Sequence, residues 1–201
     1  MDIKGLIKSR YTIRKYKDVP VPEHVINEII EAGRWASSVH GFQPWRFIVI
    51  TNDLLKMEIS DILIGKSKTI GSGLEKLLLL TAKTIANAPA IILVYNQNVF
   101  KDVAYKFHKI SNEKVEKRYI NIAELTEIEA ISGAIQNMIL SAHELGVGSC
   151  WNTIPLFCDK EINGVLKTDE QLIAVLSMGY PAEDGRRSKR KSADKTVKYK
   201  D

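Results

Sequence analysis

The residues best suited to hold an anion lie near the N-terminus, in the string Arg10-Tyr-Thr12-Ile-Arg14. In an extended backbone every second side chain points to the same face, so residues 10, 12 and 14 share one. Guanidinium groups match phosphate geometry bidentately, and a threonine hydroxyl adds a donor. The spacing therefore predicts a site for a phosphate or another anionic oxygen group, with a solvated basic loop as the alternative.

Two further segments combine glycine, small and aromatic residues in an order that suits a flat ligand. They are Ser37-Ser-Val-His-Gly-Phe-Gln-Pro-Trp45 and Gly146-Val-Gly-Ser-Cys-Trp-Asn-Thr153. Glycine lets the backbone approach a ligand closely, because it has no Cβ. Trp45 and Phe42 also suit an ordinary core, and His143 suits a helix end better than the role of a general base.

The basic charge is concentrated at the C-terminus. The 201 residues include 29 Lys and Arg against 24 Asp and Glu. Residues 186–201 hold eight of the basic and two of the acidic residues, which leaves the rest of the chain close to neutral. This distribution excludes a protein that coats nucleic acid with its whole surface. A nucleic-acid arm, a membrane-surface patch, a phosphate clamp and a solubilising tail stay open as uses of the cluster.

Several other chemistries lack their motifs. Cys150 and Cys158 are too few for a disulfide scaffold and fit no zinc spacing. No P-loop, dinucleotide-binding or G-x-S-x-G string is complete. No apolar run approaches the ~20 residues that span a bilayer, and the N-terminus does not resemble a signal peptide. We expect a cytoplasmic protein with no metal site and no membrane association.

The elements that position these segments are helices and strands intermixed along one domain, residues 1–201, of the α+β or α/β class. Apolar residues at helical spacing predict helices at residues 2–7, 22–36, 53–64, 74–86, 127–145 and 159–166. Apolar runs and alternation predict strands at residues 46–51, 90–95, 147–151 and 171–178, with a further candidate at 196–200. Residues 101–121 are irregular, and we expect either a solvated excursion with a short helix or a lid over a pocket.

The order of these strings resembles the nitroreductase family of FMN-dependent oxidoreductases. The resemblance runs from Ile3 to about Lys198, and its most specific parts are Gln43-Pro-Trp-Arg-Phe47 and Gly148-Ser-Cys-Trp151. It implies an α+β, nitroreductase-like fold with a central mixed β-sheet flanked by helices. It also implies an intertwined homodimer that binds two FMN molecules at its interface.

The resemblance assigns the phosphate end of FMN to residues from both ends of the chain. Arg10 and Thr12 hold the phosphate, and Lys189 and Arg190 complete that site. Arg14 lies near the pyrimidine edge, where a cation stabilises the negative charge of the reduced flavin. The basic extension, residues 186–201, is then half of a phosphate clamp.

The resemblance assigns the flavin ring to two other segments. From the partner subunit, the ring is lined by Ser37, Ser38, His40 and Gln43. A backbone N–H near Asn152 or Thr153 meets flavin N5. We also count Tyr11 among the cofactor-binding residues. The sequence departs from the family pattern in three places: Tyr11, where a basic residue is usual; Gly41, where Asn is common; and Asn152-Thr153, where Ile-Gly is common.

The implied activity is hydride transfer from NADH or NADPH, through flavin N5, to a small, planar, electron-poor acceptor such as a nitroaromatic, a quinone or a flavin. No side-chain acid or base is needed, because the cofactor carries the chemistry. The alternatives are a flavin-binding store without turnover, dehalogenation or enoate reduction on the same scaffold, and a nucleic-acid-binding protein that uses the tail. On the flavin interpretation the chain binds no nucleic acid, residues 101–121 shape the acceptor pocket, and Thr196–Lys200 form a strand that docks on a sheet edge.

Overall fold

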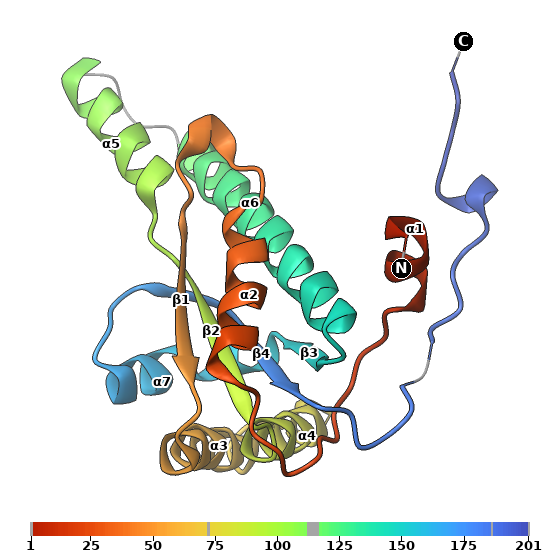
Figure 1. The fold of residues 1–201 in the computed structure, drawn as a ribbon. Coiled ribbons are helices and arrows are strands. Elements are labelled where there is room, and N and C mark those ends of the chain that lie inside the picture. Colours follow the sequence, from red (N-terminus) through yellow and green to blue (C-terminus); the bar gives the residue numbers. More distant parts are fainter. Residues whose placement is uncertain (1, 72, 112–116, 186, 201) are drawn as a thin grey trace.

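The computed structural model describes residues 2–71, 73–111, 117–185 and 187–200. The elements follow one another in the order α1 (Ile3–Ser9), α2 (Glu23–Arg34), β1 (Trp45–Ile50), α3 (Asp53–Ser67), α4 (Leu74–Ala86), β2 (Ala90–Asn96), α5 (Val99–Ser111), α6 (Lys117–Glu144), β3 (Gly148–Asn152), α7 (Asp159–Leu166) and β4 (Gln171–Gly179). Short 3₁₀ turns lie at Val39–Gly41, Ile154–Cys158 and Ala193–Lys195. The expected α+β class is confirmed (Figure 1).

The four strands of the described residues form one sheet in the order β1-β2-β4-β3, and each neighbouring pair is antiparallel. The resemblance implies a mixed sheet. The parallel pairing in the described residues is one isolated bridge, between Thr12 and Ser149 of β3. Every residue of β2 is buried, because this strand lies inside the sheet and is covered on both faces. Its uninterrupted apolar sequence follows from that position.

Helices cover both faces of the sheet (Figure 1). On one face, Ile29 of α2 and Ile135 of α6 share a core with Ile92 of β2. On the other face, residues of α3, α4 and α7 share a second core with Ile91 and Leu93 of β2. Successive side chains of a strand point to opposite faces, so β2 supplies the two cores alternately.

Most helix boundaries agree with the sequence prediction, for identifiable reasons. Asp2 accepts a hydrogen bond from the Gly5 amide at 2.7 Å and caps α1, and Asn52 accepts one from the Leu55 amide at 3.0 Å and caps α3. α4 spans the predicted residues 74–86. Within the described part of the chain, no helix combines the length and the hydropathy needed to cross a bilayer.

Residues 101–121 contain more helix than the sequence predicts. α5 occupies the first part of this range, and α6 begins at Lys117 rather than near residue 127. Ile120 and Ala123 are buried and continue the apolar stripe of α6, although charged neighbours mask that stripe in the sequence. Residues 112–116 of the expected excursion lie outside the described residues.

The strand expected at residues 196–200 is not formed within this chain. Beyond Gly185 the chain runs away from the sheet (Figure 1), and residues 187–200 are exposed. The Val197 amide donates instead to the Ala193 carbonyl at 2.8 Å, which continues a local turn. A strand needs a neighbouring strand edge, and this part of the tail lies beside none of its own chain.

Candidate functional site

The connector between α1 and α2 lies against β3 and against the segment that follows β4. The Ile13 amide donates to the Ser149 carbonyl at 3.0 Å, and the Ala182 amide donates to the Lys15 carbonyl at 3.0 Å. A Cβ on Gly148 would lie 2.8 Å from the Cβ of Ile13, so glycine permits this approach. The fold thereby joins two segments that lie near opposite ends of the sequence.

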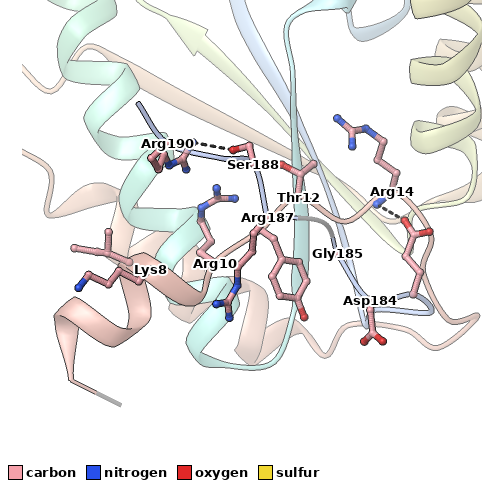
Figure 2. Close-up of a pocket in the computed structure, with 12 residues that line it drawn as sticks. Lys8, Arg10, Thr12, Arg14, Asp184, Gly185, Arg187, Ser188 and Arg190 are labelled. Atoms are coloured by element: carbon pink, nitrogen blue, oxygen red, sulfur yellow. Dashed lines mark hydrogen bonds between the residues drawn. The ribbon is translucent and has the colours of Figure 1, made fainter. Parts of the chain in front are cut away.

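A cavity of about 730 Å³ lies at this junction (Figure 2). The predicted residues that line it are Arg10, Tyr11, Thr12, Arg14 and Arg190. Arg187 and Ser188 line it as well, whereas Lys189 does not. Residues 187, 189, 190 and 191 are all basic, so the pattern alone could not indicate which of these side chains face inward.

The donors around this cavity suit a phosphate monoester. Arg10, Thr12 and Arg187 all line the cavity (Figure 2), and each guanidinium can bind two phosphate oxygens. Arg190 Nη1 donates to Ser188 Oγ at 2.9 Å, which fixes these two side chains relative to each other. The residues present therefore fit the phosphate of FMN.

Tyr11 fixes the spacing between α6 and the C-terminal segment. A Cβ on Gly185 would overlap the Tyr11 ring, and that ring meets the His143 ring edge-on with centroids 5.8 Å apart. Burial, and then the charges of two nearby arginines, lower the pKa of His143 below its usual value. The cavity lining holds five Lys and Arg against Glu183 and Asp184, and its positive charge disfavours a proton on His143.

A second cavity, of about 910 Å³, shares Arg14 and Glu183 with the first. It reaches the last turns of α4, where Lys83 and Thr84 line it. The Thr84 hydroxyl donates to the Leu80 carbonyl at 2.8 Å, so this residue shapes the wall. The sequence predicted no role for Lys83 or Thr84. What could have drawn attention to them is that a charged and a polar residue follow each other in a largely apolar helix. Arg14 thus lies on the wall between the arginine-lined cavity and a second, larger cavity that can take a ring system.

The loop predicted to line the flavin, Ser37–Gln43, lies outside both cavities and near the N-terminal half of α6 (Figure 1). Its Ser38 Oγ accepts from the Gln43 amide at 3.2 Å. His40 and Gln43 both have a φ of 46°, which is unusual for residues with a Cβ. A single chain does not bring Ser37, Ser38, His40 and Gln43 to the arginines. That they serve the partner subunit stays a prediction.

Asn152 and Thr153 also lie outside the two cavities. The Asn152 side chain is buried and donates to the Val175 carbonyl at 3.1 Å and to the Ser177 hydroxyl at 3.0 Å. It therefore holds β3 to β4, and a contact with flavin N5 through the backbone stays a prediction. No group of three or more His, Cys, Asp or Glu in the described ranges could hold a metal ion.

Known proteins are similar in sequence to most of the chain. The model of the nitroreductase family matches residues 7–180. The Bacillus subtilis protein YfhC, assigned by name to the NAD(P)H nitroreductases, is 29% identical over 184 residues that cover 90% of this chain and 85% of that protein. The iodotyrosine deiodinase of Nematostella vectensis is 28% identical over 191 residues, which cover 89% of this chain and 66% of that protein.

Solved structures share the fold. A BluB-like flavoprotein from Clostridium difficile 630 has a TM-score of 0.83 and 26% identity, with 100% of each chain covered. A nitroreductase-type protein from Desulfovibrio desulfuricans, solved in complex with FMN, has a TM-score of 0.72 and 25% identity, with 100% of this chain and 98% of that chain covered. The matched residues include the connector with its two arginines, the whole sheet and the chain as far as Tyr180. The chain belongs to the nitroreductase family.

Proposed function

We propose that the chain is an FMN-dependent oxidoreductase that takes electrons from NADH or NADPH and passes them to a small, planar, electron-poor acceptor. The observation that carries this proposal is the cavity in which Arg10 and Thr12 lie beside Arg187 and Arg190 of the basic tail. Two comparisons support it: FMN is bound in one solved relative, and NAD(P)H is in the name of YfhC.

In this proposal the residues of the first cavity bind the phosphate of FMN, and the residue shared by both cavities lies at the flavin ring. Arg10, Thr12, Arg187 and Ser188 hold the phosphate with charge-assisted hydrogen bonds. Arg14, on the wall that the cavities share, places a cation at the ring, where it favours the reduced, more negative state. FMN bound there would supply the hydride chemistry that links the nicotinamide donor to the acceptor.

The functional unit that we propose is a homodimer with two FMN sites. In the tail, Val197 is 49% exposed and Tyr199 is 89% exposed, and the two alternate with lysines. This pattern suits a strand that pairs with a sheet edge of the partner subunit. The loop Ser37–Gln43 lies outside the cavities of its own chain and would line the flavin of the partner.

Reductive dehalogenation is a second candidate for the oxidative half of the cycle. It is favoured by the similarity to an iodotyrosine deiodinase over 89% of this chain. The phosphate site and the cation at the ring serve either reaction equally, because both require the same reduced cofactor. The two candidate reactions differ only in the acceptor. For either reaction we expect the described part of α5 to border the acceptor side of the site.

The proposal is tested by the colour and the reduction of the purified protein. We expect a yellow protein that releases FMN on denaturation and is bleached by NADH or NADPH in anaerobic stopped-flow measurements. FMN binding without reduction by either nucleotide would leave a flavin store, and a colourless protein that cannot be reconstituted would overturn the proposal. Mixing the reduced protein with a nitroaromatic, a quinone and an iodinated phenol in turn identifies the acceptor class.

A further inference from the structure

Three aromatic rings join the loop Ser37–Gln43 to the beginning of α5. The Phe42 and Phe100 rings are stacked, with centroids 5.5 Å apart and planes inclined by 25°. The His40 ring lies 6.1 Å from Phe42 in an edge-on arrangement and 6.4 Å from Phe100. Stacked and edge-on rings attract each other beyond their buried area. The loop is therefore held from outside by a residue far along the sequence.

The loop needs such an external contact, because its own backbone is strained. His40 and Gln43 both adopt a left-handed conformation that residues with a Cβ rarely take, and Gly41 adopts one between them with a φ of 69°. Conformations of this kind persist where surrounding contacts enforce them. Within the loop, the Phe42 amide donates to the Val39 carbonyl at 3.0 Å and the Gln43 amide donates to Ser38 Oγ at 3.2 Å. The aromatic stack adds the link to the rest of the fold.

Phe100 is itself anchored through its backbone. Its amide donates to Glu127 Oε1 at 2.7 Å, and Glu127 is fully buried on α6. Glu127 Oε2 accepts in turn from Asn96 Nδ2 at 3.2 Å, at the end of β2. Lys101 and Glu124 form an ion pair of 3.2 Å beside it. The first turn of α5 is thus fixed to α6 and to the sheet, so Phe100 presents a rigid surface to the loop.

We propose that Phe100 is a positioning residue that sets acceptor selectivity by holding the loop Ser37–Gln43 in its strained shape. This inference rests on the proposed function, in which that loop lines the flavin of the partner subunit. Phe100 touches neither of the two cavities and acts only through Phe42 and His40. The first turn of α5 in one subunit thereby determines how much room the acceptor has in the other.

The test replaces Phe100 by leucine, which keeps the apolar bulk but removes the stacking. Hydrogen exchange of the amides of residues 41–43 should become faster by about two- to tenfold, the factor that corresponds to one aromatic pair. Exchange in β2 and α6 should stay unchanged. Phe100→Tyr, which restores a ring, should return the loop to the wild-type exchange rate. Phe157→Leu is the matched control, because it makes the same substitution at a ring that is 48% exposed and lies outside the stack and outside both cavities.

Acceptor kinetics supply the second measurement. In Phe100→Leu, kcat/KM for a bulky naphthoquinone should rise relative to that for a small benzoquinone by about the same two- to tenfold, because a loosened loop widens the site. Phe100→Tyr and Phe157→Leu should keep the wild-type ratio. Unchanged exchange in the loop, or faster exchange with an unchanged acceptor ratio, overturns the inference. The wild-type protein is tested for FMN binding before any variant is made. If it binds no FMN, the proposed function fails; if it binds FMN but the variants behave like wild type, only the inference about Phe100 fails.

Discussion

Two regions along α6 hold the polar and aromatic residues that the sequence singles out. They differ in what lines them: charged side chains in one, a strained loop with packed aromatic rings in the other. Near the C-terminal end of α6, the phosphate cavity is lined by arginines from both ends of the chain. Near its N-terminal half, the loop Ser37–Gln43 has a strained backbone and is held by aromatic packing on Phe100. The first region can bind an anion with residues of one chain. The second, residues 37–43, contains no arginine or lysine and lines neither of the two cavities of its own chain.

Deleting residues 187–201 tests the first region most severely. The deletion removes Arg187, Ser188 and Arg190 from the cavity, but no buried residue, so the body should fold and lose nearly all of its FMN. Bound FMN per chain is measured from the visible absorbance of the purified protein, and the oligomeric state by sedimentation. Deletion of residues 193–201 spares the cavity lining but removes the proposed docking strand, so comparing the two deletions separates loss of the phosphate contacts from loss of the dimer. A protein that keeps its FMN after the longer deletion would show that the tail is not part of the site.

Replacing Arg10 by alanine removes one charged donor from the same cavity. A hydrogen bond to a charged group contributes about 1.5–3 kcal/mol. FMN should therefore bind roughly ten- to hundredfold more weakly. Fluorescence titration of the apoprotein with FMN measures the change. Lys4→Ala, on α1 but outside the lining of the cavity, also removes one positive charge and should leave the affinity close to wild type. Equal losses in both variants would indicate a general charge effect.

Mixed dimers test whether the two regions act on one ligand from two chains. Arg10→Ala and Gln43→Ala homodimers should each lose FMN affinity. A dimer of one chain of each kind would combine both defects in one site and leave the other site intact, because each site takes one region from each chain. Such dimers, purified with two different tags, should hold about half of the wild-type FMN with wild-type affinity. If mixed dimers bind as weakly as the single variants, both regions serve the site of their own chain.

The two regions also differ in how far the sequence predicts them. The apolar run at residues 90–95 and the stripe that begins at Val25 predict β2 and α2, because burial dictates their residue types. Arg10 and Thr12 line one cavity, but Tyr11 between them lines it as well, so alternation alone does not describe this segment. Charge patterns alone could not decide between Lys189 and Arg187, since exposed basic residues follow no packing constraint.

Tertiary contacts explain the remaining differences. The side-chain amide of Asn152 donates to the Val175 carbonyl and the Ser177 hydroxyl within the sheet, a structural role that the resemblance does not predict. The contact of a backbone N–H in this segment with flavin N5 stays a prediction. The stacking of Phe42 on Phe100 joins residues that no local pattern connects. Lys83 faces a cavity that exists only once α4 lies beside the connector. Each of these features depends on the packing of distant segments, which periodicity does not report.

The smallest expected effect is on the pH dependence of stability through His143, which lies near Arg10 and Arg187 of the phosphate cavity. Its pKa is lowered by burial and then by Arg10 and Arg187, so the folded chain resists a proton that the unfolded chain takes up. The urea midpoint should therefore fall as the pH drops below the usual histidine value of about 6.5. His143→Gln, which does not titrate, should show a smaller fall. A bound phosphate would offset the two arginine charges and raise the pKa of His143, so FMN should narrow the difference between variant and wild type. A difference that FMN leaves unchanged would indicate that burial, the largest cause, and not the two arginines controls the pKa of His143.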